Sequence, residues 1–266
     1  MAKIAFFGAG RMATAMVRGM LARKVYAPRN IICTSALDDT AEKLAGETGI
    51  AFSLKLPDLT RDTSILVLAM KPQQLDELPE EIGMESEGKL VISILAGKTL
   101  RELTERFSSA RNIVRVMPNT PGQIGAGISA FSALEPLSEE DRESVQAILG
   151  SLGEWVELPE DQLDAVTGLS GSGPAYIFEF IAALREAGVA AGLAPAVAER
   201  LASHTVYGAA RLVIETGETP EDLRDRVTSP GGTTLAGLET LKAGGFRELI
   251  RDTVRAATER SRELAQ

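Results

Sequence analysis

Two residue types that often build reactive sites are almost absent from this 266-residue sequence, which has one cysteine, Cys33, and one histidine, His204. One cysteine excludes an intrachain disulfide and a thiolate zinc cluster. One histidine excludes metal sites with several histidine ligands, and it leaves a Ser-His-Asp triad only if His204 serves. We therefore expect no bound metal. We expect Cys33, in a predicted buried strand, to be inert, and His204, on an apolar helical stripe, to be a packed core or interface residue.

Basic residues are in the minority. The 28 Lys and Arg against 37 Asp and Glu give a net charge of −9. Without a stripe of Lys and Arg, the chain is a poor match for phosphate backbones, so we expect no nucleic-acid partner. A small anionic metabolite is compatible with this charge, because the N-terminus of a helix binds anions locally.

Long apolar runs are also missing. No stretch reaches the roughly 20 apolar residues that a membrane span needs, and the first residues, MAKIAFFGAGRM, lack the layout of a signal peptide. We expect a cytoplasmic protein with no membrane segment. The 44% share of apolar residues and the 24% share of charged ones are those of a folded globular protein.

What is present up to about residue 160 is an alternation of short apolar runs and helical patterns. Strands are predicted at residues 3–7, 31–34, 64–69, 89–95, 112–116, 127–131 and 155–158. Helices are predicted between several of them, at residues 11–23, 40–46, 100–107 and 138–149. Runs such as SILVLA and LVISIL are apolar on both faces, as buried parallel strands are. The pattern predicts an α/β fold with a doubly wound, mostly parallel sheet.

After about residue 160 the chain becomes rich in alanine and shows no strong strand signal. Helices are predicted at about 174–191, 195–216, 220–227, 233–243 and 246–264. We therefore place a domain boundary near residue 160, with an α/β domain at 1–160 and an all-α domain at 161–266. Small residues line these helices. They allow either tight packing within the chain or an interleaved helical dimer, and the abundance of apolar faces slightly favours the dimer.

A glycine-rich turn follows the first predicted strand. Gly8-Ala9-Gly10-Arg11-Met12-Ala13 has the pattern G-x-G-x-x-A and opens a helix. The first glycine permits a tight turn, the second lets backbone N–H groups approach a pyrophosphate, and Ala13 allows close packing of helix on strand. Its place in an alternating β/α chain favours dinucleotide binding in a Rossmann-like domain over a purely structural turn.

The end of the second strand bears on the choice of dinucleotide. There the chain has Cys33-Thr34-Ser35-Ala36, with no acid to bind a ribose 2′-hydroxyl. Asp38 and Asp39 come later, and capping of the next helix is the favoured interpretation for them. The hydroxyls of Thr34 and Ser35 can serve a phosphate, so we predict that NADP(H) is preferred and that NAD(H) use is possible.

Later turns share the carboxyl edge of the sheet, where open α/β folds bind ligands. Ala69-Met70-Lys71-Pro72 ends one predicted strand, Ala96-Gly97 the next, and Met117-Pro118-Asn119-Thr120-Pro121 a third. We expect these turns to flank the cofactor, the alternative for Lys71 being a plain surface lysine.

Two segments of the helical half combine serines with glycines before a helix start. They are Leu169–Tyr176, LSGSGPAY, and Ser229–Thr234, SPGGTT. Exposed N–H groups and hydroxyls at the positive end of a helix suit a small carboxylate. A plain helix-capping loop is the equal alternative for either one alone.

Taken together, GAGRMA, AMKP, RVMPNTP, GLSGSGPAY and VTSPGGTT occur in an order that closely resembles pyrroline-5-carboxylate reductases. The resemblance covers essentially the whole chain, and the last two motifs are the most specific. It implies hydride transfer from a nicotinamide cofactor to the C=N carbon of 1-pyrroline-5-carboxylate, giving L-proline. It also implies a homodimer, or a larger homo-oligomer of dimers, built on the helical half.

The resemblance also implies roles for particular residues. The cofactor pyrophosphate would lie on Phe7–Met12, that is Phe7, Gly8, Ala9, Gly10, Arg11 and Met12, with Ala69–Pro72 beside it and Ser35 near the adenosine ribose. The substrate carboxylate would lie on the helix start formed by Ser229, Gly231, Gly232, Thr233 and Thr234, with Thr234 closest to the pyrroline nitrogen. The family often has an asparagine near position 56, where this chain has Leu56.

Two other functions fit parts of the pattern. A reductase of the β-hydroxyacid dehydrogenase type shares the architecture but relies on a catalytic lysine, and no lysine lies between Lys98 and Lys242. A non-catalytic dinucleotide sensor needs the glycine turn but neither of the two serine and glycine motifs.

Overall fold

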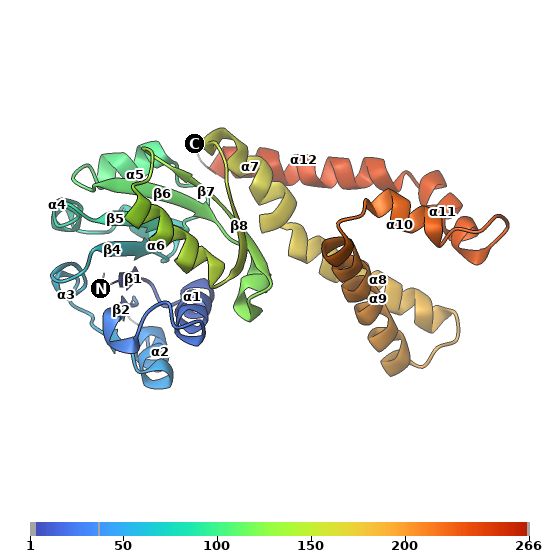
Figure 1. Cartoon of the computed structure of the whole chain (residues 1–266), viewed down its shortest axis with the longest axis horizontal. Helices are drawn as coiled ribbons and strands as arrows, with labels where there is room; N and C mark the ends of the chain where they lie inside the picture. The colour runs from blue at the N-terminus through green and yellow to red at the C-terminus, as the bar shows by residue number, and fades with distance from the viewer. Residues whose placement is uncertain (1–3, 37, 265–266) are drawn as a thin grey trace. The chain divides into compact units, whose positions relative to one another are not determined.

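The structure is a computed structural model that describes residues 4–36 and 38–264. The chain forms two compact units (Figure 1). Unit 1 comprises the residues up to Ser172 together with those from Ala256 on, and unit 2 is Gly173–Arg255. The sheet lies in unit 1, whereas unit 2 is helical throughout.

In the described part of unit 1, eight strands form one sheet in the order β3-β2-β1-β4-β5-β6-β7-β8. The strands are β1 (Ile4–Phe7), β2 (Ile31–Thr34), β3 (Ala51–Phe52), β4 (Ile65–Leu68), β5 (Leu90–Ser93), β6 (Asn112–Met117), β7 (Gly127–Ala133) and β8 (Gly153–Glu157). The first six are parallel, β7 is antiparallel to β6, and β8 is parallel to β7. This arrangement confirms the predicted mostly parallel, doubly wound fold.

Helices cover both faces of this sheet (Figure 1). One face packs on α1 (Arg11–Ala22), α2 (Thr40–Thr48) and α6 (Glu139–Gly150), and the other on α3 (Pro57–Thr60), α4 (Glu80–Met84) and α5 (Leu100–Arg106). Shorter elements are η1 (Pro28–Asn30), η2 (Pro72–Leu75), η3 (Thr120–Ile124), η4 (Glu160–Gln162), α7 (Leu163–Val166) and η5 (Thr167–Gly171). Side chains of β1 alternate between the two faces, and all four are buried. Cys33 is fully buried, and burial raises the pKa of its thiol to about 11.

The start of α6 follows the predicted capping pattern. Ser138 is its N-cap, and the Ser138 hydroxyl accepts a hydrogen bond of 3.2 Å from the backbone N–H of Asp141. We expect Ser138→Ala to lower the free energy of unfolding by about 1 kcal/mol, because that N–H loses its partner at the helix end. Urea unfolding of both proteins measures the difference, and an unchanged free energy would show that the cap is dispensable.

Unit 2 contains α8 (Gly173–Ala190), α9 (Pro195–Thr216), α10 (Pro220–Arg226), α11 (Thr233–Ala243) and the first half of α12 (Phe246–Leu264). The five predicted helices are confirmed to within one residue at each end. Pro195 occupies the first turn of α9, and the Thr219 hydroxyl caps α10 by accepting from the Asp222 N–H. Nowhere in residues 4–36 and 38–264 is a helix both long and apolar enough to cross a membrane.

The small residues of α8 and α9 have one clear use within the chain. A Cβ atom at Gly188 would lie 3.2 Å from the Cβ of Ala198, so the two helices approach closely there. Large apolar side chains on the same helices are nevertheless exposed, among them Phe178 and Ile214. His204 is exposed as well, so the core placement is wrong for this chain, and its placement in an interface stays a prediction. The physical reason is that its stripe on α9 has no covering helix in unit 2.

Candidate active site

A cleft of about 420 Å³ opens in unit 1 at the carboxyl ends of the central strands. It is lined by Phe7, Gly8, Ala9, Gly10, Thr34, Ser35, Ala36, Asp38, Thr40, Leu56, Ala69, Met70, Lys71, Gln74, Glu77, Leu78 and Pro79. Strand order reverses between β1 and β4, and ligands of open α/β sheets bind where it reverses. Eight of the predicted cofactor residues line this cleft, namely Phe7, Gly8, Ala9, Gly10, Ser35, Ala69, Met70 and Lys71.

Gly8 can only be glycine in this fold. Its φ of +114° lies in the left-handed region, and a Cβ atom there would come within 2.6 Å of the carbonyl carbon and oxygen of Ala69. The Gly8 N–H donates to the Thr34 carbonyl at 3.1 Å, and the Ala69 N–H donates to the Phe7 carbonyl at 2.8 Å. The turn is therefore clamped between the ends of β2 and β4.

Gly10 is the N-cap of α1, and the absence of a side chain matters there for a different reason. Its backbone is extended, with φ of −71° and ψ of −177°, and a Cβ atom there would meet nothing within 4 Å. A side chain would thus fit the backbone but project into open space beside the cleft. No side chain caps this helix start, so its positive end is available to a phosphate, while Ala13 packs fully buried on the sheet.

At the β2 end of the cleft, Asp38 is engaged by the following helix. Its carboxylate accepts from the backbone N–H of Thr40 at 3.0 Å and from the Thr40 hydroxyl at 2.5 Å. These hydrogen bonds hold the pKa of Asp38 below its ordinary value, with a smaller contribution from the charge of Lys71. The neighbouring Asp39 is the N-cap residue of α2 and pairs with Lys43. Asp38 thus binds the start of α2 as predicted, whereas the Asp39 side chain makes no capping hydrogen bond there.

Ser35 lines the cleft together with its neighbours Thr34 and Ala36. Its Oγ donates to the Asp38 carbonyl at 3.1 Å and accepts from the Ala41 N–H at 3.4 Å. The hydroxyl is thereby held at the mouth of the β2–α2 loop.

Several residues that line the rest of the cleft were not predicted from the sequence. Leu56, Gln74, Glu77, Leu78 and Pro79 line this part, and they come from short helical turns and the loops beside them. The Gln74 side chain accepts from the Lys71 N–H at 3.0 Å, which closes the turn after Pro72. The Lys-Pro pair was the available signal, because proline often begins a helical turn.

The other predicted cofactor residues lie at the same sheet edge but do not line the cleft. Arg11 is exposed on α1, Met12 packs against the core, and Pro72 begins η2. Ala96 is exposed after β5, and a Cβ atom at Gly97 would lie 3.0 Å from the Leu264 carbonyl. The Asn119 amide donates to the Ser170 carbonyl at 3.2 Å and accepts from the Ile128 N–H at 2.9 Å. Its polar atoms are used within unit 1.

The predicted substrate residues begin α11 in unit 2. Gly232 is the N-cap, Gly231 has a φ of +69°, and the Gly232 N–H donates to the Ser229 carbonyl at 3.0 Å. Thr233 and Thr234 form the first turn and are exposed, and no side chain caps the helix. The arrangement offers backbone donors and hydroxyls to an anion, which is the chemistry that a small carboxylate requires.

The other serine and glycine segment differs from expectation. Thr167–Gly171 forms a turn of π-helix that continues α7, and α8 begins at Gly173, so this is not a capping loop. A Cβ atom at Gly171 would lie 2.4 Å from the methyl group of Met117. The glycine therefore lets the wide helical turn pack against the end of β6.

Comparisons with known proteins agree over the full length. Residues 160–264 match the family model for pyrroline-5-carboxylate reductase dimerisation, and residues 3–97 match that of NADP oxidoreductase, coenzyme F420-dependent. A pyrroline-5-carboxylate reductase of Synechocystis is 41% identical over 264 residues, which are 99% of this chain and 98% of that protein.

Solved structures lead to the same group. A pyrroline-5-carboxylate reductase from Coxiella burnetii superposes with a TM-score of 0.93 at 35% identity, over 100% of this chain and 99% of that one. A pyrroline carboxylate reductase from Plasmodium falciparum, solved with NADP bound, gives 0.88 at 30% identity, over 100% and 98%. Both halves of the chain are thus accounted for by one set of relatives, and the protein belongs to the pyrroline-5-carboxylate reductase family.

Proposed function

We propose that this chain reduces 1-pyrroline-5-carboxylate to L-proline, the last step of proline biosynthesis, with a reduced nicotinamide cofactor as hydride donor. The observation that carries the proposal is the 41% identity to a pyrroline-5-carboxylate reductase over 99% of the chain. The reaction is an NAD(P)H-dependent reduction of a C=N bond.

The cleft of unit 1 is the proposed cofactor site. Its residues fit a dinucleotide, because Gly8 turns the chain tightly and Gly10 leaves open space before the positive end of α1. When bound, the reduced nicotinamide supplies the hydride. Phe7–Met12 hold the pyrophosphate, and the backbone of Ala69–Pro72 lies beside it. Ser35 contacts the adenosine ribose, and the Lys71 ammonium extends toward that ribose, on the side of Asp38. Ala96, Gly97 and Asn119, after β5 and β6, complete the cofactor-binding edge.

The start of α11 is the proposed substrate site. Backbone N–H groups of Gly231, Thr233 and Thr234 bind the carboxylate, with the Ser229 hydroxyl beside them. Gly232, whose N–H donates to the Ser229 carbonyl, shapes the turn that presents these donors. The Thr234 hydroxyl lies closest to the imine nitrogen and supplies a proton to it, directly or through water. A protonated imine accepts hydride readily, because the incoming electrons neutralise a cation. The sequence has one histidine, and this scheme needs none as the acid.

NADPH is the proposed preferred cofactor, with NADH accepted. Two observations support this preference. The Asp38 carboxylate is hydrogen-bonded to Thr40. Lys71 also lines the cleft, and its positive charge contributes to lowering the pKa of Asp38. The extra 2′-phosphate of NADPH pairs with a lysine ammonium, which NADH cannot do.

Lys71→Ala tests whether Lys71 distinguishes NADPH from NADH. We expect the KM for NADPH to rise about tenfold and that for NADH to change less than about twofold, because only NADPH carries the added phosphate. Lys55→Ala is the matched control, since Lys55 is exposed nearby but does not line the cleft. Equal losses with both cofactors would refute a role for Lys71 in cofactor choice.

The setting of the enzyme is part of the same proposal. We propose a cytoplasmic enzyme that acts on its small imine without nucleic acid or membrane, consistent with its net charge of −9. The helical part from residue 161 on forms a homodimer, or a larger assembly of dimers, and residues 1–160 bind the dinucleotide. The exposed apolar residues of α8 and α9 support such a dimer.

The direct test is oxidation of NADPH, followed by absorbance, in the presence of pyrroline-5-carboxylate, and its repetition with NADH. We expect rapid oxidation that depends on the imine. Tight NADPH binding without oxidation would instead favour a dinucleotide sensor, and turnover of a β-hydroxyacid would favour the other reductase class.

A further inference from the structure

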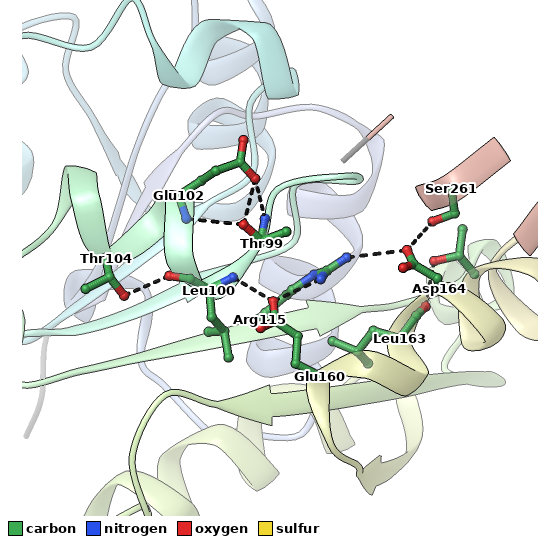
Figure 2. Close-up of polar contacts among 10 residues, drawn as sticks. Thr99, Leu100, Glu102, Thr104, Arg115, Glu160, Leu163, Asp164 and Ser261 are labelled. Carbon is green, nitrogen blue, oxygen red and sulfur yellow. Dashed lines mark hydrogen bonds and ion pairs between the residues drawn. The ribbon is translucent and has the colours of Figure 1, made fainter. Parts of the chain in front are cut away.

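A buried arginine outside the cofactor cleft joins several segments of unit 1. Arg115 lies on β6 and is 7% exposed. Its Nη1 donates to the Glu160 carboxylate at 3.0 Å, and its Nη2 lies 3.9 Å from an oxygen of Asp164 (Figure 2). One guanidinium thus faces two carboxylates, at the start of η4 and on α7.

Each of those carboxylates holds a further segment. The Glu160 oxygen that accepts from Arg115 also accepts from the Leu100 N–H at 2.6 Å, at the start of α5 (Figure 2). The Asp164 oxygen that faces Arg115 accepts from the Ser261 hydroxyl at 2.7 Å, and Ser261 on α12 is itself buried. Arg115 is therefore the centre of a network that includes α5, α7 and the last turns of α12.

Two of these segments are the connections of unit 2. The chain leaves unit 1 after Ser172, shortly beyond Asp164, and returns at Ala256, shortly before Ser261. The segment that leads into unit 2 and the segment that leads out of it are thus both joined to β6 through Asp164. The strand holds the outgoing segment a second time, because Asn119, just beyond its end, donates to the Ser170 carbonyl.

The chemistry of the network suits a device that fixes geometry. Removing a charged group such as Arg115 from water is costly, even though Glu160 and Asp164 stay partly exposed, and apolar residues of similar volume often stabilise a fold as well. A guanidinium, however, presents planar donors in fixed directions and can bridge two carboxylates, which an apolar side chain or a lysine ammonium cannot do in the same way. The network therefore specifies where α7 and α12 attach more than it adds stability.

We propose that Arg115 is a positioning residue of the reductase reaction, acting by fixing the two segments that connect unit 2 to the sheet. The inference rests on the proposed function, in which the cofactor cleft belongs to unit 1 and the Ser229–Thr234 helix start to unit 2. Hydride transfer is sensitive to small displacements of the reacting groups. Cofactor binding, which uses unit 1 alone, is expected to be insensitive to Arg115.

Arg115→Met tests this directly. We expect kcat to fall about tenfold, because a misplacement of about 1 Å costs about a hundredfold and the one expected here is smaller. The deuterium isotope effect with 4-deuterated NADPH should rise. The Kd for NADPH stays within about twofold, since its contacts are intact. Arg115→Lys keeps the positive charge but loses the planar donors that bridge the two carboxylates. We therefore expect its kcat to lie between those of Arg115→Met and the wild-type protein.

Arg111→Met is the matched control. Arg111 stands just before the same strand and binds the buried carboxylate of Asp141 at 2.5 Å, but that pair touches neither α7 nor α12. We expect this variant to lose stability while keeping its kcat and isotope effect. Equal falls of kcat in both variants, or an unchanged kcat in Arg115→Met, would overturn the proposal.

A milder pair keeps the test decisive if Arg115→Met does not fold. Asp164→Asn and Ser261→Ala loosen the link between α7 and α12 and leave the Arg115–Glu160 pair in place. Faster hydrogen exchange at residues 164–172 and 256–262, with a raised isotope effect, is the expected result. Slow exchange and normal kinetics in both would also overturn it. Failure of the proposed function is distinguishable, because the wild-type protein would then not reduce the imine.

Discussion

Gly10→Val is expected to weaken NADPH binding by about a hundredfold while the protein stays folded. The extended backbone of Gly10 suits a β-branched residue, and a Cβ atom there meets nothing within 4 Å. The added methyl groups therefore cost the apo protein little. They would occupy the space before the positive end of α1 that the pyrophosphate needs, and they would hold the phosphates away from the helix N–H groups.

Fluorescence titration with NADPH and thermal unfolding together measure the two effects. Gly46→Val is the matched control, because Gly46 is exposed on α2 and its Cβ atom would also meet nothing within 4 Å. That variant is expected to bind NADPH normally. Normal affinity in Gly10→Val would refute the assignment of the glycine turn to the pyrophosphate.

Thr234→Ala is expected to lower kcat about a hundredfold, the size of effect that a well-placed proton donor has. Thr234 belongs to the exposed first turn of α11, in unit 2, and the cofactor cleft belongs to unit 1. The Kd for NADPH should therefore stay as it is. Loss of the hydroxyl removes the proposed donor for the imine nitrogen, so the loss of rate should shrink as the pH falls and more imine arrives protonated.

Two controls separate this effect from a local change in the helix. Thr234→Ser keeps a hydroxyl and should retain most of the turnover. Thr240→Ala lies on the same helix, where its hydroxyl donates to the Ala236 carbonyl, and should leave kcat unchanged. Unchanged turnover in Thr234→Ala would remove Thr234 from the mechanism.

Strong local signals predicted most of the fold. The strand Ile31–Thr34 and the helix Pro195–Thr216 have the bounds expected from their apolar patterns, and Ser138 and Thr219 cap helices as their sequences indicate. The missed strand, Ala51–Phe52, has two residues and is exposed, so no periodicity marks it. The π-helical turn at Thr167–Gly171 was missed because its shape depends on packing against Met117, fifty residues earlier in the chain.

The residues of the candidate site likewise include some that local sequence patterns predicted and some that they could not predict. The glycine turn was predicted because the chemistry of phosphate binding requires its spacing. Gln74 and Glu77 could not be predicted as lining residues, since short irregular turns present them to the cleft. Nor does any local pattern place Arg115 beside Glu160 and Asp164, or Asp164 beside Ser261, 97 positions away. Pairings of that kind follow from how the whole chain folds.

The central claim is that this chain transfers a hydride to the imine carbon of pyrroline-5-carboxylate. The most direct measurement uses NADPH deuterated at nicotinamide C4 on the transferred side and examines the product by NMR and mass spectrometry. The account predicts L-proline with one deuterium at C5, the former imine carbon. Unlabelled proline, or cofactor consumed without proline, would contradict it.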